Sequence, residues 1–261
     1  MFFDKTPANN KTLVTSGKQM FSCGHAETIG VRNTMEDASA IIGEFAGVGT
    51  QYFAVFDGHG GSNVSAFCAN NLHLEISRNL KTEASVEKAI ENAFKRANDA
   101  ASKWPCEGCT AAIAIIIQNT IYCANVGDSR VILVENGHAT RMTYDHKASD
   151  PTERDLVNQR GGVVINGRVN GILMVSRAIG DAELGDACSC QPYIKKSHRK
   201  DGMKMVIACD GVFDVMTDED VAQIASSCSN TAEAARIIKD ESIKRGSLDN
   251  VTCIVINLTP K

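Results

Sequence analysis

The sequence predicts an α+β fold: a four-layer α-β-β-α sandwich in which two central antiparallel β-sheets are flanked by helices. Two observations lead to this prediction. Strand-like segments follow one another through connections of two or three residues, which join antiparallel neighbours. The helix-like segments are grouped and do not alternate with every strand, and each has one apolar face, which suits a layer that covers a sheet.

The first half of the chain is expected to form two strands and then two helices. Residues 38–42 and 52–56 have the aromatic and β-branched content that is typical of strands. Apolar residues then recur at three- and four-residue steps over residues 64–80 and 85–103, as they do along the buried face of a helix.

The middle of the chain is expected to form four strands and a short helix. Turn-forming residues separate the strands, so neighbouring strands should pair antiparallel. In SDPTERDLVNQRGG, Asp150 is expected to cap a helix that starts at Pro151. Glu153 would close a capping box, and Gly161 would end the helix. The four strands are expected over residues 110–117, 120–126, 130–134 and 138–143.

The C-terminal part is expected to add strands on either side of two helices. The first strands lie around residues 162–169 and at residues 205–209. Apolar periodicity predicts the helices over residues 218–227 and 232–245. A buried strand over residues 251–257 completes the pattern.

Composition and charge narrow the classes of function. Without an internal repeat or a clear linker, residues 21–261 are expected to form one domain after a loosely held lead-in over residues 1–20. The net charge is −4, from 27 basic and 31 acidic residues, which does not favour nucleic-acid binding. The longest apolar run, residues 111–117, is far too short to cross a membrane. The N-terminus has no signal-peptide pattern, and a monomer is expected.

The ten cysteines favour a reduced, cytoplasmic environment, with the nucleus as an alternative. Most of them lie in apolar segments, where a free cysteine packs as a small hydrophobic residue. Two pairs offer a zinc site as another interpretation, but a C-x₂-C and a C-x-C do not make two C-x₂-C pairs. A redox C-x₂-C is disfavoured because the first pair opens a strand-like segment. The pairs are Cys106 with Cys109 and Cys188 with Cys190.

Acidic residues lie at the ends of several predicted strands. The strand-like YFAVF runs directly into Asp57, Gly58 and His59. A turn is the simple alternative, because Asp-Gly is a common turn pair. However, acids recur at the same kind of position elsewhere in the chain, which separate turns would not require. These acids are Glu36, Asp37, Asp128, Asp210, Asp214 and Asp249.

If the sheets bring these acids together, their charges need a counter-ion. Two like charges 4 Å apart cost about 4 kcal/mol at an effective dielectric of about 20. Oxygen ligands favour Mg²⁺ or Mn²⁺ over zinc, and this many acids suit two ions that share Asp57. The carbonyl of Gly58 is open to an ion because glycine has no Cβ. Water between two such ions yields hydroxide near neutral pH, which predicts phosphoester hydrolysis.

Two further residues suit that reaction. Arg32 lies four residues before Glu36, and a guanidinium binds phosphate with two parallel hydrogen bonds. His59, two residues after Asp57, could protonate a leaving alkoxide. The simple alternatives are a solvated surface arginine and a histidine that makes a local hydrogen bond in a turn.

Eight sequence blocks, spanning about residues 22–258, resemble the metal-dependent Ser/Thr protein phosphatases of type 2C, the PPM family. The resemblance implies a fold of two central antiparallel sheets with flanking helices. It also implies hydrolysis of phosphoserine and phosphothreonine on phosphoprotein substrates, by direct attack of a water or hydroxide that bridges two Mg²⁺ or Mn²⁺ ions. The blocks are RNTMEDA, FAVFDGHGG, GCTAAIA, ANVGDSRVIL, DHKASDPTERDLVNQRGG, RVNGILMVSRAIGD, VIACDGVFDVM and LDNVTCIVI.

The resemblance implies roles for the acids. Asp57 would bridge the two ions, and the Gly58 carbonyl would bind one of them. Asp210 and Asp249 would bind the other ion. Glu36 and Asp37 would hold metal-bound waters. Asp128 and Asp214, with Asp210, match positions that bind a third, weaker ion in some members.

The resemblance also assigns the two remaining candidates and shows where this chain departs from the family. Arg32 matches the phosphate-binding arginine, and His59 matches the proposed general acid. Cys109 replaces a small hydroxyl residue, which is expected to affect packing only, and Ala148 replaces a proline. Residues 182–189 form a short version of a region that shapes substrate choice in the family, so specificity is the property that carries over least.

Two other functions are alternatives to an active metal-dependent phosphatase. A pseudophosphatase would bind a partner without turnover, but such proteins generally lack a metal-binding acid, and none is missing here. A cysteine-dependent phosphatase needs a C-x₅-R loop, and none of the ten cysteines has an arginine six residues later. The sequence therefore favours the active, metal-dependent enzyme.

Overall fold

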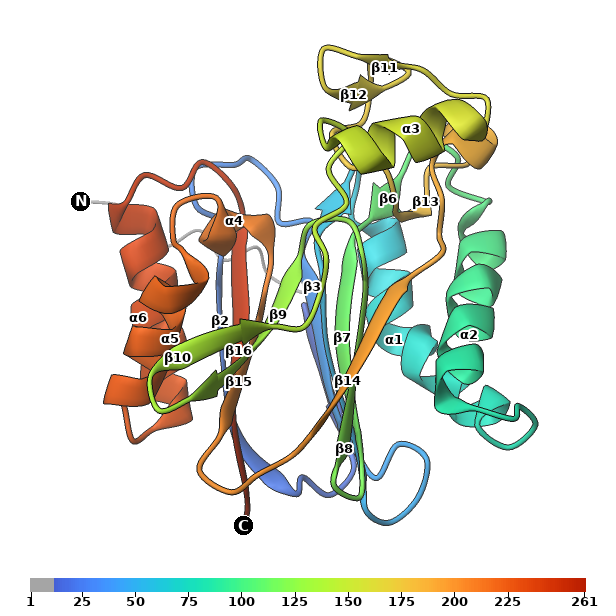
Figure 1. Ribbon diagram of the computed structural model, residues 1–261. Helices are drawn as coiled ribbons and strands as arrows, with labels where there is room; N and C mark the ends of the chain where they lie inside the picture. The colour runs from blue at the N-terminus through green and yellow to red at the C-terminus, as the bar shows by residue number, and fades with distance from the viewer. Residues whose placement is uncertain (1–11) are drawn as a thin grey trace.

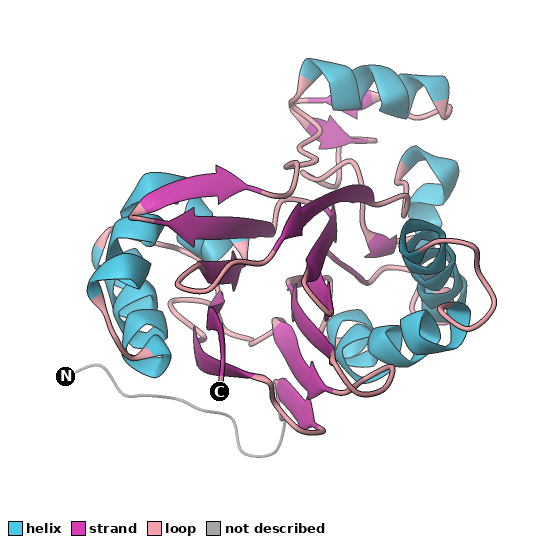
Figure 2. Cartoon of the chain, turned by 60° about the horizontal axis from the view of Figure 1, so that its bottom comes forward, coloured by secondary structure: helices cyan, strands magenta, loops and turns pink. Residues whose placement is uncertain are grey.

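The structure, a computed structural model that describes residues 12–261, has four layers (Figure 1). Two β-sheets pack face to face in the centre, and helices cover the outer face of each sheet (Figures 1 and 2). The predicted α-β-β-α sandwich is confirmed. None of the helices in the described part is long and apolar enough to span a membrane.

The first sheet has six strands. Its neighbouring strands are antiparallel except for β1 and β3, which run parallel. β1 corrects the expectation of an irregular lead-in over residues 1–20, whereas residues 1–11 lie outside the described part of the chain. In spatial order the strands are β1 (Leu13–Ser16), β3 (Ala38–Gly43), β4 (Thr50–Phe56), β7 (Ala111–Ile117), β8 (Thr120–Val126) and β14 (Tyr193–His198).

The second sheet has five strands and is antiparallel throughout. Its edge strand β2 and the edge strand β14 of the first sheet were not expected from the sequence. The segment of β2 contains few β-branched residues, and β14 is largely exposed, so neither carries a buried-strand pattern. In spatial order the strands are β10 (His138–Arg141), β9 (Arg130–Glu135), β15 (Lys204–Ala208), β16 (Val251–Pro260) and β2 (Phe21–Thr28).

Helices begin at capping residues that the sequence provides. α2 (Val86–Ala101) starts after Ser85, whose side chain accepts a hydrogen bond from the Lys88 N–H. α5 (Asp218–Ser227) starts with a capping box between Thr217 and Asp220. α1 and α2 cover the first sheet, and α4, α5 and α6 cover the second. Their bounds are α1 (Asn63–Asn79), α4 (Asp210–Phe213) and α6 (Thr231–Lys244).

Three apolar cores hold the layers together. One lies between the first sheet and α1 and α2, one between the two sheets, and one between the second sheet and α4, α5 and α6. Phe53, Ile116 and Ile254 are fully buried in the middle core. Burial of each such side chain contributes about 1.5–3 kcal/mol, so the sheets form a rigid base for their loops.

A smaller unit, which we call the α3 segment (residues 146–191), lies at one end of the sandwich (Figure 1). α3 (Pro151–Gln159) is capped by Asp150 as expected. The Glu153 side chain does not close a capping box, because it binds Ser176 and Arg177 instead. The strands expected around residues 162–169 are a short hairpin of β11 (Val164–Ile165) and β12 (Arg168–Val169). The segment also contains β13 (Ile179–Gly180), which pairs with β6 (Gly108–Cys109) next to β5 (Gly58–His59), and the 3₁₀ turn Ala182–Ala187.

Candidate active site

A cavity of about 910 Å³ brings the predicted site residues together. Loops at the ends of β4, β8, β15 and β16 line it, together with parts of the α3 segment between residues 147 and 175. Asp37 is the one predicted residue that does not line the cavity; it lies buried behind it, 3% exposed. The predicted residues that line the cavity are Arg32, Glu36, Asp57, Gly58, His59, Asp128, Asp210, Asp214 and Asp249.

The backbone around Asp57 is fixed by hydrogen bonds across the sheet. Asp57 follows β4, and its carbonyl accepts a hydrogen bond from the Thr110 N–H at 2.9 Å. A Cβ on Gly58 would collide with the Glu36 carbonyl oxygen and the Ser65 hydroxyl. Glycine is therefore required here for close packing, which holds Asp57 at the mouth of the cavity.

Two acids of the site have a buried carboxylate oxygen without a hydrogen-bond partner. The Oδ2 of Asp37 accepts a hydrogen bond from the Thr252 hydroxyl at 2.6 Å, but its Oδ1 has no partner. The Oδ1 of Asp210 is likewise buried and unpartnered. Leaving a buried polar atom unsatisfied costs about 1–3 kcal/mol, and more for a charged group. A cation that accepts oxygen ligands would bind these two carboxylate oxygens and remove the cost of leaving them unsatisfied. Asp37 and Asp210 therefore fit a divalent metal.

The pKa values of these acids show the same lack of counter-charge. Burial, and then the charges of Asp210 and Asp37, raise the pKa of Asp57 well above its usual range. Burial, followed by neighbouring carboxylates, raises the pKa of Asp210 to about 8, and burial raises that of Asp37 to about 7. Among residues 12–261, no lysine, arginine or histidine pairs with Asp37, Asp57 or Asp210; Arg32 and Lys147, which line the cavity, pair with other acids.

Cys209 joins this cluster, although the sequence pattern suggested only a buried hydrophobic position. Ligand atoms of Asp37, Asp57 and Cys209 all lie within 4.8 Å of one another. Burial raises the pKa of the Cys209 thiol well above its usual range, so the thiol stays protonated and is a poor ligand for a hard cation. In the part of the chain that the structure describes, no other group of three such residues has this spacing, which gives the cysteine pairs of the zinc alternative no support.

Arg32 and Glu36 lie on the loop before β3. The Arg32 Nη2 pairs with the Asp249 Oδ2 at 2.6 Å, and its Nε donates to the Leu248 carbonyl at 3.2 Å. The Arg32 side chain is 56% exposed, so it can turn from Asp249 toward a ligand in the cavity. Glu36 accepts hydrogen bonds from the Thr34 hydroxyl and from the Gly61 N–H.

His59 is held by an acid that the sequence did not single out. Its Nε2 lies 2.8 Å from the Oδ2 and 3.0 Å from the Oδ1 of Asp181, which follows β13. Gly108 provides the space for this pair, because a Cβ there would overlap both side chains. Asp181 has a left-handed backbone with φ of 52°, which aspartate tolerates better than most residues. His59 is therefore an oriented imidazole.

Lys147 is a second residue that the sequence did not single out. Its Nζ lies 3.1 Å from the Oδ2 of Asp128 and 3.2 Å from the Oδ1 of Asp214. Burial opposes the charged form of Lys147, but the two carboxylates outweigh it and raise its pKa. An ammonium group therefore neutralises one corner of the cavity, the corner that the resemblance assigns to a third ion.

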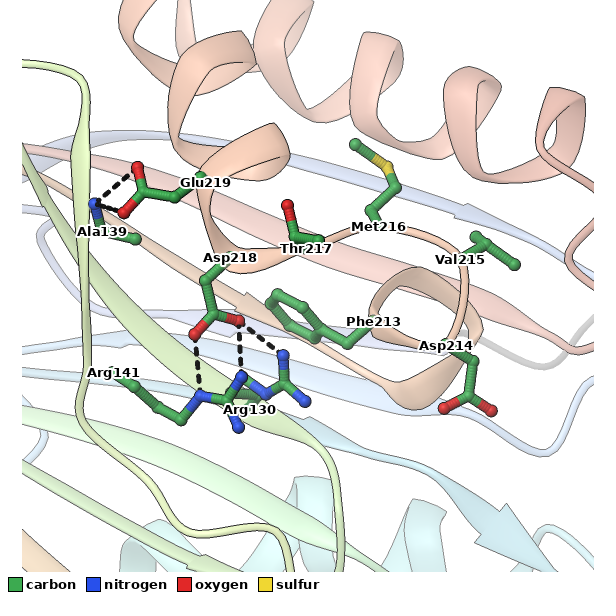
Figure 3. Close-up of a pocket in the computed structure, with 10 residues that line it drawn as sticks. All are labelled: Arg130, Ala139, Arg141, Phe213, Asp214, Val215, Met216, Thr217, Asp218 and Glu219. Atoms are coloured by element: carbon green, nitrogen blue, oxygen red, sulfur yellow. Dashed lines mark hydrogen bonds and ion pairs between the residues drawn. The ribbon is translucent and has the colours of Figure 1, made fainter.

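A second cavity, of about 650 Å³, lies beside the first and shares Asp214 and Val215 with it (Figure 3). One of its acids, Asp218, is paired with two arginines. The Oδ1 of Asp218 accepts a hydrogen bond from Arg130 at 2.5 Å, and its Oδ2 accepts one from Arg141 at 2.7 Å. Arg130 also pairs with Asp145 and stacks on the Phe213 ring. This cavity contains none of the uncompensated acids.

Comparison with known proteins gives this geometry a family context. A family model described as protein phosphatase 2C matches residues 21–251. The chain is 36% identical over 242 residues to "Protein phosphatase 2C homolog 1" of Schizosaccharomyces pombe, and the alignment covers 87% of this chain and 70% of the relative.

Solved structures have the same fold. A sex determining protein of C. elegans aligns with a TM-score of 0.84 and 27% identity, over 94% of this chain and 66% of that chain. A phosphatase of Toxoplasma gondii aligns with a TM-score of 0.81 over 94% of this chain and 97% of that chain. At 20% identity, the second likeness concerns the fold alone.

Proposed function

The chain belongs to the protein phosphatase 2C family and is a metal-dependent serine/threonine protein phosphatase, and we propose that it works by direct attack of a water-derived nucleophile at a two-ion centre built on Asp57. Its substrates would be phosphoserine and phosphothreonine on proteins. The supporting observation is the cluster of Asp37, Asp57 and Asp210, whose charges the described residues leave uncompensated.

The residues that would hold the ions follow from the resemblance and from this cluster. Asp57 and the Gly58 carbonyl would hold one Mg²⁺ or Mn²⁺ ion, and Asp57, Asp210 and Asp249 the other. Glu36 and Asp37 would act through water molecules. When bound, two such ions supply a nucleophile from water near neutral pH and offset the charge of the phosphate.

Arg32 and His59 would act on the substrate. Arg32 would leave Asp249 and bind two phosphate oxygens through its planar guanidinium. Asp181 holds the His59 ring through Nε2, which leaves Nδ1 as the nitrogen able to donate a proton to the leaving serine or threonine oxygen. These roles require only side-chain rotation within the cavity.

Phosphate release from a phosphothreonine peptide tests this function. Protein stripped with EDTA should be inactive and should recover with added Mn²⁺ or Mg²⁺. Asp210→Ala should abolish the recovered activity, whereas Asp218→Asn, in the arginine-paired cavity, should retain it. Peptide binding without any release of phosphate would favour the pseudophosphatase alternative, and activity that survives EDTA would exclude the metal-dependent mechanism.

The setting of the enzyme is also a proposal. We propose a monomer in the cytoplasm, with the nucleus as the alternative compartment. All ten cysteines are free and six are buried, which suits a reducing environment. Fractionation of cells with an antibody to the chain, and the mass of the purified protein in solution, would test the two statements.

A further inference from the structure

Of the described lysines and arginines that line the cavity, Lys147 is the one that pairs with two carboxylates. Its Nζ lies between Asp128 and Asp214, at 3.1 and 3.2 Å. The two arginines that line the cavity are engaged differently: Arg32 pairs with Asp249, and Arg168 donates to the Ile172 carbonyl. The described part of the chain thus supplies one cation to Asp249 and one to Asp128 and Asp214, but none to Asp37, Asp57 or Asp210.

We propose that Lys147 is an intrinsic competitor for divalent ions: it occupies the place of a cation between Asp128 and Asp214, and an ion binds this pair only after the lysine side chain leaves. The inference rests on the proposed function and deepens it, because it divides the cavity into two parts. At the centre on Asp57, an ion meets one basic side chain on a single ligand, the Arg32 that pairs with Asp249, and none on Asp57 or Asp210 among the described residues. An ion at Asp128 and Asp214 must displace Lys147 from both of its carboxylates.

The burial of the three side chains supports a displaceable contact. Asp128 is almost fully buried, at 8% side-chain exposure, so it needs a positive partner. Asp214 and Lys147 are 59% and 36% exposed, which gives the lysine a path into water. An ammonium group and a divalent ion repel each other strongly at such short range, so the same two carboxylates cannot hold both.

The backbone of Lys147 connects this corner to the α3 segment. Lys147 forms an isolated β-bridge with Val175. On either side of it, the Ala148 N–H donates to the Met174 carbonyl at 2.7 Å, and the Ser176 N–H donates to the His146 carbonyl at 2.9 Å. The Lys147 side chain therefore links residues 174–176 of the α3 segment, through its own backbone, to Asp128 and Asp214. An ion that displaces the side chain also breaks this link.

Calorimetric titration of Mn²⁺ into the metal-free protein tests the proposal. In Lys147→Met, the weakest Mn²⁺ should bind about tenfold more tightly than in the wild type, or an additional Mn²⁺ should become measurable. Lys95→Met is the matched control, because Lys95 pairs with Asp99 at 3.2 Å on the surface of α2, and its titration should equal that of the wild type. Adding Asp128→Asn to Lys147→Met should remove the gain.

Several results would overturn the proposal. One is a weakest Mn²⁺ affinity that is the same in Lys147→Met and in the wild type. Another is an equal gain in Lys95→Met. A higher KM for a phosphopeptide with unchanged Mn²⁺ affinity would instead make Lys147 a substrate-binding residue. If Lys147→Met does not fold, as judged by its thermal melt, Lys147→Gln serves in its place with the same expected gain.

The failure of this inference can be told apart from failure of the proposed function. If tight Mn²⁺ binding and phosphopeptide hydrolysis are both present but the weakest site ignores Lys147, only the lysine's role is wrong. If the wild type binds no Mn²⁺ tightly, the two-ion centre itself is wrong, whatever Lys147→Met does.

Discussion

Two neighbouring clusters of acids in this molecule differ in where their counter-charge comes from. At the arginine-paired cavity, Asp218 faces Arg130 and Arg141 (Figure 3). Arg130 also pairs with Asp145, which lies next to this cavity. Burial would raise the pKa of Asp218, but hydrogen bonds and charges from the two arginines outweigh it and lower the pKa. At the larger cavity, burial and neighbouring carboxylates raise the pKa of Asp57 well above its usual range.

The comparison shows which cluster serves the fold and which serves a ligand. A paired cluster is complete without any bound ion, and breaking it should lower stability. In an unpaired cluster the carboxylates repel one another in the folded protein, and a bound cation is needed to offset their charge. Asp214 lines both cavities and pairs with Lys147. The larger cavity therefore contains both paired and unpaired acids.

The largest expected effect is at the unpaired cluster. Asp57→Asn should lower phosphate release from a phosphopeptide by about 10³-fold or more, because it removes the shared ligand of the proposed centre. The same change should raise the stability of the metal-free protein by about 1–3 kcal/mol, because it removes a buried like charge. Urea unfolding in EDTA measures the second quantity. A metal-free Asp57→Asn that is less stable than the wild type would contradict the assignment.

The opposite sign is expected at the paired cluster. Arg130 is 9% exposed, so Arg130→Met leaves the half-buried Asp145 and Asp218 with too little positive charge and should cost about 3–5 kcal/mol of unfolding free energy. Arg236→Met, which breaks an exposed pair with Asp240, should cost under about 1 kcal/mol. Urea unfolding of both variants would settle the point, and a similar cost for the two would show that burial does not distinguish them.

His146 extends the comparison to a buried base. Burial, and then the Arg177 charge, lower its pKa from 6.5 to about 4. As the pH falls, His146 is therefore protonated in the unfolded chain before it is protonated in the folded protein. The free energy of unfolding has its full value above pH 6.5 and decreases as the pH drops toward 4. The loss should be about 3 kcal/mol. His146→Asn, which can still donate to the Gly127 carbonyl, should remove most of this acid sensitivity, whereas the exposed His138→Asn should leave it unchanged.

The sequence predicted the layers and most of the cavity because those signals are local. Each core strand carries its own apolar run, and Asp57 and Asp210 each follow such a run directly. The edge strands β2 and β14 lack that run, because one of their faces is not buried in a core.

Asp181 and Lys147 could not be predicted for a different reason. Asp181 meets His59 across 122 positions of the chain, and Lys147 meets Asp214 across 67. Both residues lie in sequence blocks of the resemblance, but the partner of each lies far away in the chain, so only the tertiary fold reveals the pairing.

The smallest expected effect is the stabilisation of the folded protein by added Mn²⁺. It tests the comparison most directly, because Mn²⁺ supplies the cation that the unpaired cluster lacks. At a Mn²⁺ concentration of about 100 times the dissociation constant, binding should stabilise the wild type by about 2.7 kcal/mol. Asp218→Asn should keep this gain in stability, because the Asp218 carboxylate is already paired with arginines. Asp57→Asn should lose most of the gain, because Asp57 belongs to the unpaired cluster. Thermal melts with EDTA and with Mn²⁺ measure the difference for each protein. A gain that survives in Asp57→Asn, or that disappears in Asp218→Asn, would mean that the unpaired cluster does not hold the ions.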